Sequence, residues 1–203
     1  MNPTSSPIPG FSASRKWRVK PLKKGTRAAR QTHLPQMLLS AMMAGLITAG
    51  SQLAIPLPLV PINLALLAVF MAGFLLNIRW ALASILLYLL MGALGLPVFA
   101  GFKGGPQHLL GPTGGYLMGY VLCVAVVAWL APWADTFKKK ALICALGTLA
   151  CYACGTLWLK WLTGRSLSSV LGLAVLPFVP GDLLKCLAAA FLAPRLQRIS
   201  RSL

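Results

Sequence analysis

Long apolar runs separated by short polar or glycine- and proline-rich links are the main pattern along this 203-residue chain. A helix crosses the ~30 Å hydrocarbon core of a bilayer with about 20 mostly apolar residues. The runs are apolar on all sides, as expected for helices that pack in lipid rather than on a soluble surface. The pattern predicts six membrane-spanning helices, at Met37–Ile55, Pro61–Leu76, Trp80–Leu96, Gly114–Trp133, Ala141–Leu162 and Leu171–Ala193.

Composition supports an all-α, polytopic membrane protein. Hydrophobic residues make up 58% of the chain and charged residues 10%, whereas soluble domains are about 25% charged. Strands of a membrane β-barrel would alternate apolar and polar residues, and no segment does so. We expect one membrane domain over residues 37–195. The flanking segments are a basic tail at 1–36, disordered in the cytoplasm or a cleaved transit segment, and a short basic tail at 196–203.

Lysine and arginine residues are concentrated on alternate links, which predicts the orientation. One set of links and ends carries most of the 19 basic residues, namely Arg15, Lys16, Arg18, Lys20, Lys23, Lys24, Arg27, Arg30, Arg79, Lys138, Lys139, Lys140, Arg195, Arg198 and Arg201. The opposite links carry only Lys103, Lys160 and Arg165. Short links rich in Lys and Arg stay cytoplasmic, so both termini are predicted inside the cell (inner) membrane. The net charge of +17 then indicates topology and contact with anionic lipid, not nucleic-acid binding.

The chain has only two acidic residues, Asp135 and Asp182. They are predicted on opposite sides of the membrane, which excludes catalysis by a pair of carboxylates. His33 lies in the basic tail and His108 in a link, each without a second histidine nearby. The Cys151–Cys154 pair lies in an apolar span and lacks a partner pair, which favours simple helix packing over a metal site. We therefore expect no metal and no cofactor.

Two links on the outer side have unusual compositions. Ile55–Pro61 has three prolines in seven residues and no charge, which favours extended chain folded onto the bundle. Gly95–Gly115 has seven glycines and three prolines. Long links without secondary structure are usually functional, and glycine lets the backbone approach a ligand closely. The helix expected to begin at Gly114-Gly115 would favour an anionic group at its start. A link that only caps the bundle is the alternative.

The last apolar run contains an acid and a base at helical spacing. Pro177 and Pro180 interrupt its early part, and Asp182 and Lys185 follow three residues apart, on one helix face. Ionisable residues inside a membrane are costly and usually face the bundle interior or a functional site. The pattern predicts a pocket for a small polar ligand, with Phe99 and Tyr116 as aromatic walls. A structural salt bridge is compatible with the same spacing.

Three motifs in order, GLPVFAG (Gly95–Gly101), GPTGGYLMGY (Gly111–Tyr120) and LPFVPGDLLK (Leu176–Lys185), together resemble the BioY family. Its members are the biotin-specific substrate-binding (S) components of energy-coupling-factor (ECF) transporters. The resemblance covers roughly residues 37–195 and includes IPLPLVPINLALLAV (Ile55–Val69). The chain departs from the family at Asn63-Leu64-Ala65, where members commonly have Thr-Leu-Gln.

The resemblance implies a six-helix S-component bundle with an outward-facing biotin site lined by Asp182 and Lys185. An ionised Asp can accept from the ureido N–H groups of biotin, and a Lys can donate to its carbonyl. Phe99 and Tyr116 would hold the bicyclic ring. The valerate carboxylate would meet Lys103 or backbone N–H groups of the glycine-rich link, for which the candidates are Gly104, Gly105, Gly114 and Gly115.

The resemblance also implies a transmembrane T coupling protein and two ABC ATPases as partners. Small residues at four-residue spacing, Ala41, Gly45 and Ala49, form a candidate surface for the T protein. Packing inside the bundle is the alternative for this stripe. The chain lacks a Walker motif, so ATP hydrolysis would have to come from a partner. The resemblance implies a binding component, and we expect the chain not to be an enzyme. The alternative function is a small membrane acyltransferase whose glycine-rich link holds a phosphate.

Overall fold

The structure is a computed structural model that describes residues 34–55 and 60–201. Three of the predicted spans are long apolar helices, α2 (Leu34–Gln52), α6 (Gly114–Leu130) and α7 (Phe137–Thr163). A short 3-10 turn, η1 (Ala131–Trp133), extends α6. α7 is the longest, at 27 residues or ~40 Å. Each of these three helices is long and apolar enough to cross a membrane.

The second and third predicted spans are helical but shorter. α3 (Ala65–Leu75) has 11 residues and α4 (Ile78–Ala93) has 16. By length and composition, the described residues supply three membrane-crossing helices, or four if a bent pair at the C-terminal end counts as one span. The predicted count of six full-length spans is therefore not confirmed by helix length. Almost every residue of α3 is buried, so this short helix lies inside the bundle.

The last predicted span is not one continuous helix. α8 (Leu167–Ala174) and α9 (Val179–Arg201) meet at an angle of 58°. The break falls at Pro177 because proline lacks an N–H donor and disfavours helix at the residue before it. α9 then continues to Arg201, through most of the segment predicted as a C-terminal tail. Most of the segment predicted as an N-terminal tail lies outside the described residues.

The two links predicted on the outer side contain more secondary structure than their composition predicts. β1 (Ala54–Ile55) pairs with β2 (Ile62–Asn63) in a small antiparallel ribbon. The prolines at 56 and 58 between these strands lie outside the described residues. A short helix, α5 (Pro106–Leu110), interrupts the glycine-rich link. An isolated bridge between Phe99 and Lys103 forms a turn in the same link.

Polar side chains mark several helix starts. The side chain of Asn77 accepts a hydrogen bond from the N–H of Trp80 at the start of α4, and Thr136 and Ser166 do the same for α7 and α8. These contacts satisfy N–H groups that have no partner inside the helix. Asp135, just before α7, forms an exposed ion pair with Lys139 at 2.9 Å. The hydrogen bond and charge of Lys139 lower the pKa of the Asp135 carboxyl.

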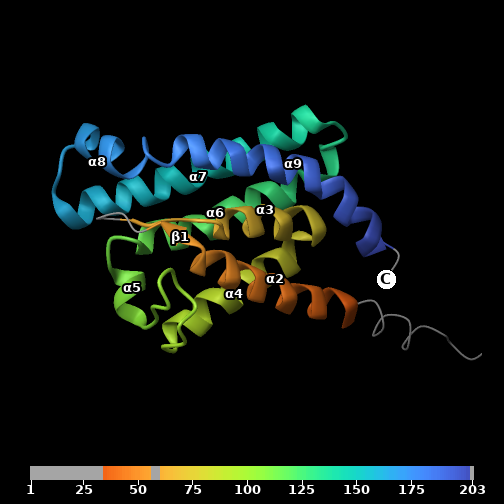
Figure 1. Cartoon of the computed structure of the whole chain (residues 1–203), viewed down its shortest axis with the longest axis horizontal. Coiled ribbons are helices and arrows are strands. Elements are labelled where there is room, and N and C mark those ends of the chain that lie inside the picture. The colour runs from red at the N-terminus through yellow and green to blue at the C-terminus, as the bar shows by residue number, and fades with distance from the viewer. Residues whose placement is uncertain (1–33, 56–59, 202–203) are drawn as a thin grey trace, which may run out of the picture.

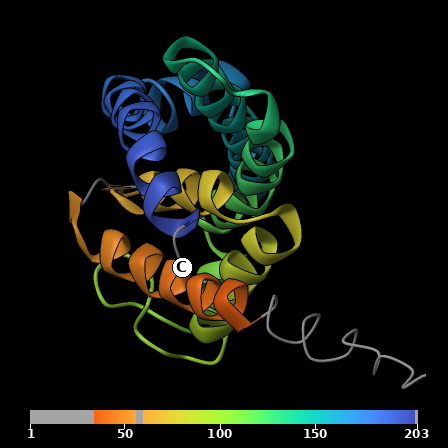
Figure 2. The same ribbon diagram turned by 90° about the vertical axis from the view of Figure 1, so that its right-hand side faces the viewer.

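The helices form an elongated bundle with two distinct ends (Figure 1). The ribbon β1, the short helix α5 and the α7–α8 link lie at one end, on the left of Figure 1. The start of α2, the α3–α4 and α6–α7 links, and the end of α9 lie at the other. Figure 2, viewed along the bundle, shows α7 and α9 on one side of α3, and α2 and α4 on the other.

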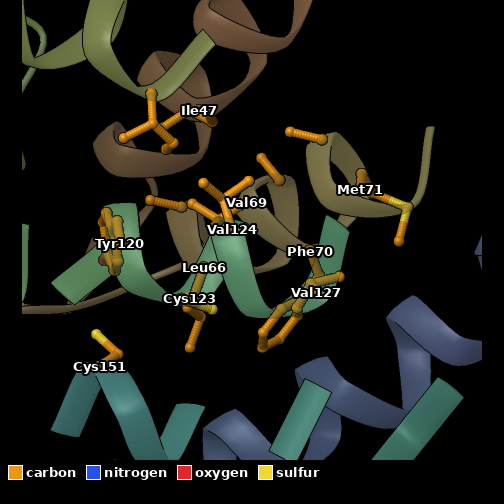
Figure 3. Packing of buried hydrophobic residues seen from close by; sticks show 14 of the residues in the cluster. Ile47, Leu66, Val69, Phe70, Met71, Tyr120, Cys123, Val124, Val127 and Cys151 are labelled. Atoms are coloured by element: carbon orange, nitrogen blue, oxygen red, sulfur yellow. The ribbon is translucent and has the colours of Figure 1, made fainter. Parts of the chain in front are cut away.

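The core lies where α2, α3 and α6 meet (Figure 3). Ile47 of α2, Val69 and Phe70 of α3, and Val124 and Val127 of α6 are all completely shielded from solvent. α6 packs most extensively on α7. Because α3 contacts α2, α6 and α9, this one short helix joins the two sides of the bundle.

Candidate functional site

A cavity of about 420 Å³ opens at the end of the bundle that carries β1 and α5. This volume is within the range of about 300–1,000 Å³ typical of small-molecule pockets. Its walls come from α2, the β1–β2 ribbon, α4, the glycine-rich link and α6. The lining residues are Gln52, Ala54, Val60, Pro61, Asn63, Tyr88, Phe99, Ala100, Gly101, Lys103, His108, Thr113, Tyr116, Leu117 and Tyr120.

A smaller chamber of about 30 Å³ adjoins this cavity. The two share part of their lining, including Asn63, Tyr116 and Tyr120. The chamber reaches α7 and α9, where Asp182 and Lys185 line it. Asp182 and Lys185 therefore do not line the large cavity itself. They line the chamber that adjoins it.

Asp182 and Lys185 form a buried ion pair on α9. Lys185 Nζ is 2.6 Å from Asp182 Oδ1, and the Tyr152 hydroxyl donates to Oδ2 at 2.6 Å. Both charged residues are only 4–6% exposed. The bend before α9 places Asp182 in the first turn of that helix, where the positive end of the helix dipole favours a carboxylate. Each oxygen still has a lone pair to offer, and the ammonium has unused N–H donors.

The two predicted aromatic residues line the large cavity from different elements. Tyr116 of α6 stacks on Phe178 with ring centroids 6.4 Å apart, and its hydroxyl donates to Ala174 O at 2.9 Å. Phe99 packs edge-on against Tyr88, with centroids 5.5 Å apart. Both predicted residues are almost fully buried. Tyr116 lines both the large cavity and the chamber, so this residue forms part of the boundary between them.

The four predicted glycines do not line the cavity. A Cβ at Gly104 would lie 2.3 Å from Leu96 O, and one at Gly115 would lie 2.3 Å from Trp158 Cβ. A Cβ at Gly114 would clash with Leu109 O, and Gly105 has a φ of +102°. These glycines therefore have a packing role: they let the link turn and lie close to neighbouring chain. Their predicted contact with a ligand has no support in this geometry.

Several polar residues of the cavity escape sequence reasoning. Gln52 donates to Pro97 O and Phe99 O, both at 3.2 Å, and accepts from the N–H of Phe102 at 2.9 Å, so it fastens the glycine-rich link to α2. Tyr88 hydrogen-bonds Ser51 at 2.8 Å. Gln52 lies at the end of an apolar run and Tyr88 lies within another. Sequence reasoning missed both residues because hydropathy does not reveal which face of a helix lines a cavity.

Lys103 and His108 line the part of the cavity formed by the glycine-rich link. Lys103 is exposed and His108 half-buried, with the His108 ring edge-on to Phe99 at 6.4 Å. A lysine ammonium here can attract the anionic end of a ligand. The site thus combines apolar walls, the exposed Lys103 ammonium, and the buried Asp182–Lys185 ion pair in the adjoining chamber.

Other predicted residues lie away from the cavity. Ala41, Gly45 and Ala49 are exposed on α2, and a Cβ on Gly45 would meet no atom within 4 Å. This stripe therefore does not pack inside the described bundle. Cys151 is buried and donates to Tyr116 O at 3.6 Å, whereas Cys154 is half-buried on the outer surface of α7.

Comparisons with known proteins agree on one family. Its sequence profile, that of the BioY family, matches residues 23–202. The chain is 36% identical over 162 residues to the probable biotin transporter BioY of Pyrococcus horikoshii, covering 80% of this chain and 96% of that protein. It is 35% identical over 164 residues to the biotin transporter BioY of Thermotoga maritima, covering 81% and 96%. A crystal structure of the S component for biotin from an ECF-type ABC transporter matches with a TM-score of 0.77 and 27% identity, over 83% of this chain and 93% of that one.

Proposed function

The chain belongs to the BioY family, and we propose that it binds biotin in the cavity described above and serves biotin uptake as the S component of an ECF-type transporter. The observation that carries this proposal is the buried Asp182–Lys185 pair beside an aromatic-walled cavity of about 420 Å³. A membrane acyltransferase is not supported by the family or by the site.

The proposed pose places the ureido ring toward the chamber. Asp182 accepts from a ureido N–H, because carboxylate acceptors make strong hydrogen bonds. Tyr116 and Phe99 hold the bicyclic ring between aromatic faces. The valerate chain then runs toward the glycine-rich link, where Lys103 meets its carboxylate. This pose needs the ligand or Tyr116 to open the boundary between the cavity and the chamber.

We propose that all six apolar segments cross the membrane, with both termini in the cytoplasm. α3 and α4 are shorter than a full membrane span. α3 is surrounded by α2, α4, α6 and α9, so it contacts protein rather than lipid and need not match the full thickness of the bilayer. Exposed tryptophans lie near opposite ends of the bundle, Trp129 and Trp133 around the end of α6, and Trp161 near the end of α7. Tryptophan is enriched at both membrane interfaces. The end that carries the α3–α4 and α6–α7 links would face the cytoplasm.

We propose that transport needs a T coupling protein and two ABC ATPases, because this chain lacks an ATP-binding motif. The exposed stripe of Ala41, Gly45 and Ala49 would receive the T protein, since small residues let helices approach closely. A Gly45→Trp variant should keep biotin binding but lose energised uptake. Leu149→Trp, at a similarly exposed position on α7, is the control and should keep both.

Uptake of radiolabelled biotin tests the function. Cells that can neither make nor import biotin would express this chain together with a T protein and ATPases. We expect labelled biotin to accumulate in them, and unlabelled biotin to compete with it while lipoate and thiamine do not. Accumulation equal to that of cells without the chain, despite its presence in the membrane, would refute the proposal.

A further inference from the structure

Asn63 occupies the boundary between the large cavity and the chamber, and lines both. It ends β2, one residue before the N-cap Leu64 of α3. A polar side chain at this position can touch a ligand in either space.

Two contacts fix the orientation of the Asn63 amide. The backbone N–H of Ala65 donates to Oδ1 at 3.1 Å, and the Tyr120 hydroxyl donates to the same atom at 3.3 Å. A backbone N–H can only donate, so the atom that it meets must be the oxygen. The Nδ2 amide group is therefore turned away from both contacts.

The two N–H donors of Nδ2 have no acceptor among residues 34–55 and 60–201. No residue in the described part of the chain accepts a hydrogen bond from this group, and it is not among the atoms sealed from solvent without a partner. The amide is thus a pre-oriented neutral donor on a residue that lines both the cavity and the chamber. Asp182 lines the same chamber as an acceptor. Together they offer a donor and an acceptor to one ligand group.

A cyclic urea matches this arrangement, because its carbonyl acceptor lies between two N–H donors. Resting on the proposed biotin function, we infer that Asn63 donates through Nδ2 to the ureido carbonyl oxygen while Asp182 accepts from an adjacent N–H. Asn63 is then a specificity residue: it selects a ligand with an acceptor at the carbonyl position. The Ala65 and Tyr120 contacts keep the donor in place before the ligand arrives.

The test compares biotin with 2-iminobiotin in the wild-type protein and in an Asn63→Asp variant. The protonated guanidinium of 2-iminobiotin presents N–H donors where biotin has its carbonyl oxygen. An aspartate at position 63 still accepts from Ala65 and Tyr120, so the local fold is conserved, but it presents an acceptor in place of Nδ2. We expect Asn63→Asp to weaken biotin binding by about tenfold or more and to strengthen 2-iminobiotin binding.

Affinities of Asn63→Asp for both ligands within about twofold of wild type would overturn this inference. If that variant does not fold in detergent, Asn63→Ser decides, because its short hydroxyl can accept from Ala65 but cannot replace the amide donor. Asn63→Ser should lose biotin affinity, and unchanged affinity would again overturn the role of Asn63. Failure of the wild-type protein to bind biotin would instead refute the proposed function.

Discussion

The proposed site depends on one ionic contact, the Asp182–Lys185 pair. The pair is buried on α9, and Tyr152 from α7 completes its hydrogen bonding. A buried pair contributes little net stability, but removal of one partner leaves an uncompensated charge and costs about 3–5 kcal/mol. Each partner therefore depends on the other for its stability in the buried environment.

An Asp182→Asn substitution should lower the melting temperature in detergent, because it leaves the Lys185 ammonium unpaired. The double variant Asp182→Asn/Lys185→Met removes both charges and keeps an acceptor for Tyr152, so it should recover most of the lost stability. It should not recover biotin binding. Equal melting temperatures for wild type and the single variant would show that the pair has no structural role.

Sequence alone singles out residues whose chemistry is rare in an apolar run, and it overlooks residues whose chemistry is common there. Asp182 and Lys185 stand out because ionisable residues in apolar runs are few, and the structure brings them together. Tyr88 and Tyr120 do not stand out, because a tyrosine in an apolar helix is equally compatible with core or lipid contact. The glycines of the link are conspicuous, but sequence alone does not reveal which backbone packs against them. Gly104 and Gly114 pack on carbonyl oxygens of their own link.

The α6–α7 contact shows how helix packing positions the cavity wall. A Cβ at Gly155 of α7 would lie 2.4 Å from Cδ1 of Tyr116, so the glycine makes room for the ring. Segments such as α6 and α7 are predictable because their apolar runs are long. The break between α8 and α9 is only hinted at by the prolines, because hydropathy stays high across it.

A Gly155→Ala substitution should destabilise the protein by about 1–3 kcal/mol, the usual cost of an overpacked core. It should also weaken biotin binding, because the Tyr116 ring must move. Gly45→Ala is the matched control, since its new methyl group would meet no neighbour. Thermal unfolding and biotin titration of both variants check this prediction. A Gly155→Ala protein as stable as Gly45→Ala would contradict the packing that the structure shows.

Many basic residues of the bundle lie at the end opposite the cavity. The starts of α4 and α7 and the last part of α9 lie at the same end of the bundle, and they carry Arg79, Lys138–Lys140 and Arg195. The cavity opens at the other end. Positive residues remain on the cytoplasmic side, so the cavity should face outward and receive ligand from outside the cell.

Cysteine labelling in intact cells tests this orientation. All five native cysteines are buried or half-buried, which keeps the background low. A Ser168→Cys variant, exposed at the start of α8, should react with a membrane-impermeant maleimide. An Asp135→Cys variant, exposed before α7, should react only after the membrane is opened. The reverse pattern would place the cavity on the cytoplasmic side.

Isothermal titration of the detergent-purified protein with biotin tests the central claim most directly. The account predicts saturable binding with one biotin per chain, and markedly weaker or no binding of lipoate and thiamine. The Asp182→Asn variant should bind biotin more weakly by about 1.5–3 kcal/mol, the scale of a hydrogen bond to a charged group. Absence of any biotin binding by the folded wild-type protein would contradict the account.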